Sequence, residues 1–251
     1  MSNEALVRWS TLVITAIAIV GAFVGSGLLG GIPVQDAAGG WLSSTATPIA
    51  PAGTAFRIWS LIYLGLACYA VWQLGESSLR LDRVRWLIAL SALLNALWIG
   101  AVQLGWLAAS LVIIVVLLAV LLLIMSRLTD SPDSGWELTF VDITLGLYLG
   151  WITLATLANL SAWLWSLGYR GEPLGESGYG IAMVVIALLI GMATVFAFSR
   201  LTPALASSWG LIWVCVARWA EHRTLALVAL AAAVVLVVGA ICWKLREPRP
   251  A

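Results

Sequence analysis

The sequence of 251 residues is 62% hydrophobic and only 10% charged, and its mean hydropathy is +1.03. Soluble domains are about half apolar and a quarter charged, so this composition excludes a soluble globular protein and indicates burial in a lipid bilayer. The net charge of +1 offers no basic surface to nucleic acid, and the single lysine, Lys244, ends the last apolar segment, which excludes a retinal-type Schiff base in the membrane and a P-loop.

Eight apolar segments are long enough to cross the hydrocarbon core of a bilayer, which requires about 20 residues per helix. Only loop-sized polar stretches separate them, so the sequence leaves no room for a soluble domain on either side of the membrane. We therefore predict an all-α integral membrane protein, a bundle of about eight transmembrane helices. In chain order the predicted segments are Trp9–Leu29, Ala55–Leu74, Trp86–Leu104, Trp106–Ser126, Leu138–Leu167, Tyr179–Ser199, Pro203–Trp219 and Leu225–Trp243.

The first segment follows a short N-terminal region, a pattern that signal peptides also show. Its apolar run is long for a signal peptide, so we expect a retained helix. A GxxxG motif within this segment is typical of close helix packing, and the sequence leaves open whether that packing occurs within one chain or in a homodimer. The small residues of this stripe are Gly21, Gly25, Gly27, Gly30 and Gly31.

Two features of the later segments predict local structure. Gly105 is almost all that separates the third segment from the fourth, so we expect a tight antiparallel hairpin there. The seventh segment gives the weakest hydropathy signal, because Ser207 and Ser208 interrupt it and Arg218 closes it.

The loops on the two sides of the membrane differ in their number of basic residues. With eight spans both termini lie on one side, and that side collects nine basic residues against three on the other, or four if Arg57 is counted. The positive-inside rule then places both termini in the cytoplasm and the loop of residues 31–53 outside, and we expect a bacterial plasma-membrane protein. The nine residues are Arg8, Arg80, Arg83, Arg85, Arg127, Arg200, Lys244, Arg246 and Arg249.

The fifteen tryptophans divide into two groups. Those at segment ends fit the aromatic belts that anchor helices at the membrane interface. Trp59, Trp98 and Trp151 instead lie inside segments, two of them beside polar residues. A buried tryptophan offers a flat apolar face and one N–H donor, which suits a planar ligand and equally suits plain helix packing.

Three stretches of sequence carry a family resemblance. Residues 48–63 lead into the second segment, residues 94–98 (Leu-Asn-Ala-Leu-Trp) lie in the third, and residues 148–159 lie in the fifth. In order, segment number and spacing they resemble the tryptophan-rich sensory protein and translocator protein family (TspO/MBR). The resemblance covers about residues 9–167 and implies a five-helix bundle that binds porphyrins, haem and other hydrophobic ligands between its helices.

The chain departs from the family pattern in four places. Phe56 and Trp59 are one residue closer than in the family's shorter members. Leu147 replaces a proline that precedes Tyr148, so a kink in the fifth helix is not assured. Leu160 and Leu164 replace the family's cholesterol-associated tyrosine and arginine, so sterol binding is not carried over. The usual family chain ends with the fifth helix, so we predict a TspO-like bundle over residues 1–170 and a three-helix extension over residues 171–251 that the resemblance does not explain.

The resemblance places the ligand between the second, third and fifth helices, beneath a lid formed by Pro48, Pro51 and the loop after the first helix. Helical spacing agrees, because the fifth-helix candidates fall within an arc of about 80°. The sequence alone leaves open the alternative that the two candidate asparagines only join helices by hydrogen bonds. The candidate ligand-binding residues are Pro51, Phe56, Trp59, Tyr63, Asn95, Trp98, Tyr148, Trp151, Ala155 and Asn159.

The resemblance implies a membrane-embedded sensor or carrier for a hydrophobic planar ligand such as a porphyrin or haem. The alternative is a secondary transporter that uses the last three helices, for which Asp142 and Arg57 are the nearest charged candidates. Asp142 reads equally well as a functional acid or as an interface residue near a helix N-terminus. We expect His222 to be solvated in a loop rather than to be a haem ligand, and we expect no catalytic residue, no metal site and no required cofactor.

Overall fold

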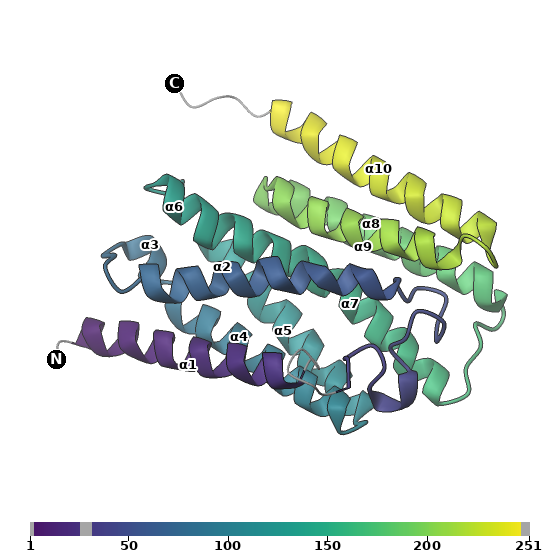
Figure 1. Ribbon diagram of the computed structural model, residues 1–251. Coiled ribbons are helices and arrows are strands. Elements are labelled where there is room, and N and C mark those ends of the chain that lie inside the picture. The colour runs from purple at the N-terminus through teal and green to yellow at the C-terminus, as the bar shows by residue number, and fades with distance from the viewer. Residues whose placement is uncertain (1–2, 26–31, 247–251) are drawn as a thin grey trace. The chain divides into compact units, whose positions relative to one another are not determined.

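The computed structural model describes residues 3–25 and 32–246, which form helices and loops with no β-strand (Figure 1). Eight helices or runs of helix in this region are long and apolar enough to cross a membrane, which confirms the predicted all-α membrane fold. In chain order the elements are α1 (Asn3–Gly25), η1 (Ala38–Gly40), η2 (Gly53–Arg57), α2 (Ile58–Trp72), α3 (Leu79–Asp82), α4 (Arg85–Gln103), α5 (Leu107–Arg127), α6 (Gly135–Glu137), η3 (Leu138–Ile143), α7 (Thr144–Ser166), α8 (Gly175–Phe198), α9 (Leu201–Arg218) and α10 (Arg223–Arg246).

The observed spans follow the predicted segments closely. The second span joins η2 to α2, and the fifth is a continuous run of α6, η3 and α7 over Gly135–Ser166. Helix α1 begins at Asn3, earlier than the predicted Trp9, and the predicted end at Leu29 lies outside the described residues. The short helix α3 was not predicted, because its four residues carry no apolar periodicity.

The chain packs as two compact units that exchange segments of sequence. Unit 1 consists of residues 1–39 and 57–145, and unit 2 consists of residues 40–56 and 146–251. The loop after α1 therefore belongs in its second half to the same unit as α8, α9 and α10. The predicted division into a TspO-like bundle (residues 1–170) and a three-helix extension (residues 171–251) is a different division, based on the family resemblance. It stays a prediction.

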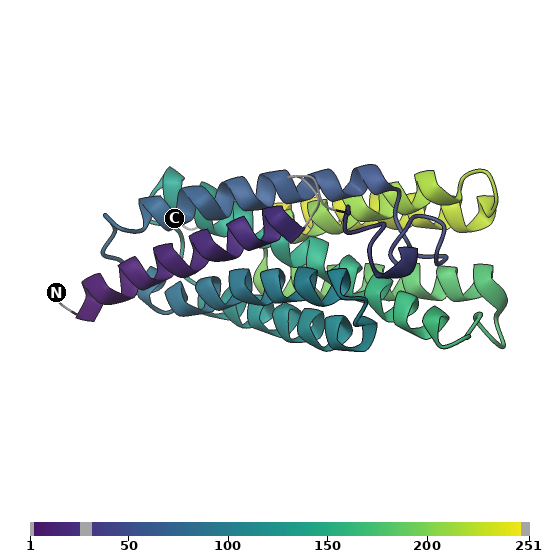
Figure 2. The same cartoon turned by 60° about the horizontal axis from the view of Figure 1, so that its bottom comes forward.

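In unit 1, helix α4 packs most extensively against α1 and α5, and α2 packs against α1 and η3 (Figure 2). The predicted hairpin between α4 and α5 is confirmed. Gly105 has a positive φ of 74°, and the N–H groups of Gly105 and Trp106 donate to the carbonyls of Val102 and Ala101. This is a Schellman turn, which satisfies the free carbonyls at the end of α4 and reverses the chain at a glycine.

Of the small-residue stripe in α1, Gly21 lies against α4 of the same chain, since a Cβ placed on it would come within 3.9 Å of the Ala96 Cβ. Gly27, Gly30 and Gly31 lie outside the described residues. A homodimer therefore stays a prediction.

In unit 2, helix α10 packs against α9 and α8 through small side chains. Ala226, Ala229 and Ala233 of α10 are at most 2% exposed, so the helix backbones approach closely. The two serines that weakened the seventh segment are buried and partnered: the Ser207 hydroxyl donates to the Gly150 carbonyl of α7 at 3.0 Å, and the Ser208 hydroxyl donates to the Ala233 carbonyl of α10 at 3.1 Å. The weak hydropathy of α9 thus reflects polar groups that join helices.

The end of the loop after α1 is part of the core of unit 2. Ile49 is fully buried and packs in a cluster with apolar residues of α7, α8, α9 and α10. The Ala52 N–H donates to the Trp213 carbonyl of α9 at 3.0 Å. Pro48 and Pro51, which were predicted to form a lid, are buried as well. The exposed residues of this loop lie earlier in the chain.

Candidate functional site

Four of the predicted ligand-binding residues meet in unit 1 on α2 and α4. Trp59 and Tyr63 are four residues apart on one face of α2, and their rings stack with centroids 5.1 Å apart and an interplanar angle of 17°. Trp98 of α4 lies 6.5 Å from the Trp59 ring, and the Asn95 Nδ2 donates to the Tyr63 hydroxyl at 2.8 Å. All four are at most 8% exposed. We call them the α2–α4 cluster.

Two polar atoms of this cluster are buried without a hydrogen-bond partner among the described residues: the Asn95 Oδ1 and the Trp98 Nε1. A buried polar group that makes no hydrogen bond costs about 1–3 kcal/mol, and native proteins rarely keep one without a reason. One of these atoms accepts and the other donates. The cluster therefore combines buried aromatic rings with one unpaired acceptor and one unpaired donor.

The other six candidates belong to unit 2. Phe56 at the end of the loop meets the Trp151 ring of α7 edge to face, with centroids 5.6 Å apart. Tyr148, Trp151 and Asn159 are at most 2% exposed, whereas Ala155 on the same helix is half-buried. Pro51 is buried in the loop. Four of the ten predicted residues thus lie in unit 1 and six in unit 2, where Phe56 and Trp151 are in contact.

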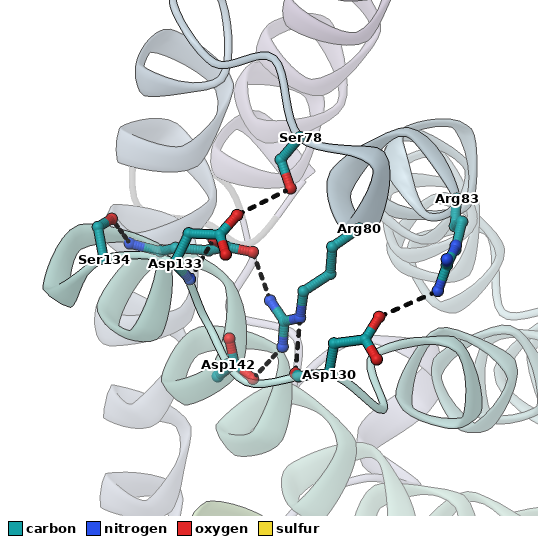
Figure 3. Close-up of polar contacts among 8 residues, drawn as sticks. Ser78, Arg80, Arg83, Asp130, Asp133, Ser134 and Asp142 are labelled. Atoms are coloured by element: carbon teal, nitrogen blue, oxygen red, sulfur yellow. Dashed lines mark hydrogen bonds and ion pairs between the residues drawn. The ribbon is translucent and has the colours of Figure 1, made fainter.

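Asp142 is not a solvated interface residue. Its Oδ1 accepts from the Arg80 Nη2 at 2.6 Å, and the Glu137 Oε1 accepts from the Arg80 Nη1 at 2.5 Å (Figure 3). The Arg80 Nε donates to the Asp130 carbonyl at 2.9 Å. All three charged side chains of this triad are at most 4% exposed, so unit 1 buries two carboxylates against one guanidinium.

The local helix geometry explains why one arginine reaches both acids. Residues Leu138–Ile143 form a π-helix, whose hydrogen bonds run from i to i+5. In an α-helix Glu137 and Asp142 would point about 140° apart, since each residue turns the helix by about 100°. The wider π turn brings two residues five positions apart to nearly the same face. Sequence reasoning missed this triad because Arg80 is 62 residues from Asp142 and reads as a loop charge.

A second buried arginine in unit 1 holds the connection between α2 and α4. Arg85 is fully buried, and its guanidinium donates to Asp82 at 2.8 Å, to the Glu76 carbonyl at 2.8 Å and to both oxygens of Gln73. Two of the nine basic residues counted for orientation, Arg80 and Arg85, are therefore buried within unit 1. The predicted orientation stays a prediction.

The described residues contain no group of three metal-ligating side chains. His222 is half-buried rather than freely solvated, and its Nδ1 lies 2.9 Å from the Ser177 hydroxyl of α8. A histidine fixed in this way by a neighbouring hydroxyl has one ring nitrogen already engaged.

A family model described as TSPO-like protein matches residues 12–242. The chain belongs to the TSPO-like family. No curated protein and no solved structure matched it. The resemblance predicted from three short stretches is confirmed.

Membership has two consequences for this TSPO-like chain. It indicates a membrane-embedded sensor or binding protein whose environment is the lipid bilayer, in agreement with the eight apolar helices. The match also continues through α8, α9 and most of α10, so the last three helices fall within the region that the TSPO-like family model describes.

Proposed function

We propose that this protein is a membrane-embedded sensor or carrier that binds a hydrophobic planar ligand such as a porphyrin or haem. The observation that carries the proposal is the α2–α4 cluster, in which stacked aromatic rings adjoin one unpaired acceptor and one unpaired donor. Small-molecule sites in proteins are mostly apolar and aromatic, with a few polar groups that fix the orientation of the ligand.

A porphyrin matches this chemistry in shape and in polarity. Its macrocycle is flat and apolar, as a stack on Trp59 or Trp98 requires. Its peripheral carboxyl groups suit both free atoms, since a carboxylate accepts from the Trp98 N–H and a protonated carboxyl donates to the Asn95 Oδ1. The alternative that Asn95 only joins helices accounts for its bond to Tyr63, but it leaves the two unpaired atoms unexplained.

The residues of unit 2 enter the proposal through the family resemblance. Phe56 and Trp151 already contact one another edge to face, so an added ligand would have to share or replace that contact. We propose Pro51, Phe56, Tyr148, Trp151, Ala155 and Asn159 as further ligand contacts. They are tested separately from the α2–α4 cluster.

The decisive measurement is a titration of the purified protein in a neutral detergent with protoporphyrin and with haem, followed by the Soret absorbance of the ligand. We expect saturable binding that weakens at least about tenfold in Asn95→Leu and in Trp98→Phe, since each removes one hydrogen bond from a buried site. Trp98→Phe keeps an aromatic ring and removes the N–H group. Trp151→Phe tests the α7 contribution in the same assay.

Trp106→Phe is the matched control, because Trp106 is 60% exposed and lies outside both groups of candidates. Its affinity should equal that of the natural protein. Binding that is unsaturable, or equally strong in all variants, would show that porphyrins only partition into the detergent and would overturn the proposal.

The structure gives the transporter alternative no specific support. That alternative requires charged groups near the middle of the membrane. The buried triad instead lies where the fifth span begins, around α6 and η3.

A further inference from the structure

Unit 2 contains a pocket of about 240 Å³ at the ends of its helices. Its walls come from loop residues 41–48, the end of α7, the start of α8 and the turn between α9 and α10. The α7–α8 connection and the α9–α10 turn lie at the same end of this unit, at the right of Figure 1. None of the ten candidate ligand-binding residues lines this pocket, although Pro48 and part of the loop predicted to act as a lid do.

Two buried donors line this pocket without a partner. Arg218, the last residue of α9, is 4% exposed; its Nε is buried without a hydrogen-bond partner among the described residues, and Glu221 and Glu176 act on its charge without forming an ion pair. Thr47, from the loop, is 2% exposed, and its hydroxyl likewise has no partner within the described ranges. A buried cation without a counter-ion is costly, and proteins normally pair it.

The surroundings of Arg218 compensate its charge only in part. Glu176 and Glu221 line the same pocket but are exposed, and neither forms an ion pair with it. Helices α8 and α10 both begin at the pocket, with Glu176 in the first turn of α8 and His222 directly before α10. Helix N-termini carry partial positive charge, so they add to the preference for an anion.

The remaining walls suit a small molecule rather than bulk water alone. Trp41 and Trp165 give the pocket two aromatic sides, and Arg170, which is exposed, donates to the carbonyls of Trp165 and Tyr169 at its edge. The pocket thus combines a mainly polar lining with two aromatic side chains and two buried donor atoms that lack a partner among the described residues. This combination fits a small polar molecule that carries an oxyanion.

We propose that this pocket binds the oxyanion of a small ligand, a carboxylate or a phosphate, with the Arg218 guanidinium and the Thr47 hydroxyl as its donors. Arginine matches the two oxygens of such groups through parallel N–H donors, and hydrogen bonds between charged groups are the strong ones. The oxyanion belongs either to a water-soluble molecule or to a lipid headgroup. The inference does not depend on porphyrin binding at the α2–α4 cluster.

The test uses the full-length protein labelled with 5-fluorotryptophan and observed by ¹⁹F NMR. Trp41→Phe and Trp165→Phe assign the two resonances that report on the pocket. The first arm titrates succinate and inorganic phosphate in an uncharged detergent. The second arm compares nanodiscs of phosphatidylcholine with nanodiscs of phosphatidylglycerol. We expect the two assigned resonances to shift saturably in one of these arms while the other tryptophan resonances stay in place.

Arg218→Gln and Thr47→Val should each weaken this binding at least about tenfold, because each removes a donor to the oxyanion. Thr47→Val keeps the side-chain shape, so it remains informative if Arg218→Gln fails to fold. Arg223→Gln is the control, since Arg223 lies over the Trp219 ring at 5.2 Å and does not line the pocket.

A shift with succinate or phosphate identifies a water-soluble ligand, and a shift confined to the nanodiscs identifies a lipid headgroup. No saturable shift in either arm, or a shift unchanged in both variants, would overturn the proposal. Porphyrin affinity, measured in parallel, should be unchanged in Arg218→Gln, because Arg218 lies in α9, outside the α2–α4 cluster and outside the predicted lid, so the two proposals fail or succeed independently.

Discussion

Arg80 and Arg218 are both buried arginines at helix ends, but they differ in their partners. Arg80 meets two carboxylates within 2.6 Å, whereas Arg218 meets none among the described residues. In the sequence Arg80 lies in a charged loop stretch and Arg218 ends an apolar segment, and neither position indicates its partners. The difference arises from residues far away along the chain, so hydropathy could locate each arginine but could not say which one has partners.

The triad of unit 1 should be costly to break. Arg80→Met leaves Glu137 and Asp142 buried without a cation, so we expect the free energy of unfolding to fall by about 3–5 kcal/mol. Equilibrium unfolding in mixed micelles of dodecyl maltoside and sodium dodecyl sulfate measures this change. Adding Glu137→Gln and Asp142→Asn to Arg80→Met should restore part of the loss, because the uncompensated charges are then gone.

Arg83→Gln is the control for this prediction. Arg83 pairs with Asp130 at 3.1 Å, but both side chains are more than half exposed. Exposed pairs contribute less than about 1 kcal/mol, so this variant should unfold close to the natural protein. Equal losses in Arg83→Gln and Arg80→Met would mean that the triad does not stabilise the fold.

At the scale of the element, hydropathy predicted the helices well and their irregularities poorly. Apolar length identified all eight spans, and Gly105 marked the α4–α5 hairpin. The π-helix in the fifth span was not predictable, because the extra residue in its turn leaves no mark on the hydropathy of Leu138–Ile143. A π-helix changes which side chains share a face, so periodicity assumed from an α-helix misplaces Glu137 relative to Asp142.

Close approach of α7 to α9 requires glycine at position 150. A Cβ on Gly150 would lie 2.1 Å from the Pro203 carbonyl oxygen, which is backbone and cannot rotate away. We expect Gly150→Ala to lower the free energy of unfolding by about 1–3 kcal/mol through this overlap. The same micelle unfolding assay measures it.

Gly100→Ala provides the comparison, since nothing lies within 4 Å of a Cβ at this position in α4. It should not destabilise the protein, because alanine has the higher helix propensity. A Gly150→Ala protein as stable as Gly100→Ala would show that α7 and α9 have room to separate.

For the whole molecule, the sequence predicted the membrane fold, the number of spans and the family. Of the candidate site, helical spacing predicted that Trp59 shares a face with Tyr63 and Asn95 with Trp98, and the family resemblance predicted that the two helices meet. The sequence did not predict that residues 40–56 pack with the last helices, since an irregular loop carries no periodic pattern that indicates its neighbours. The pocket at Arg218 was missed for the same reason.

The predicted orientation is tested by labelling single cysteines. In a background where Cys68, Cys215 and Cys242 are alanine, Asp36→Cys and Ser131→Cys each place one thiol at an exposed loop position. The count of basic residues predicts that a membrane-impermeant maleimide labels Asp36→Cys in intact cells and labels Ser131→Cys only after permeabilisation. The reverse pattern would place both termini outside.

The contact between the loop after α1 and helix α9 has a consequence for how the protein is made. The Trp209 indole N–H donates to the Ala55 carbonyl, 154 residues earlier in the chain. Synthesis proceeds from the N-terminus, so residues 47–55 leave the ribosome well before the helices that bury them. During that interval their apolar side chains and backbone groups lack these partners. Unit 2 can close only after α9 and α10 have been inserted.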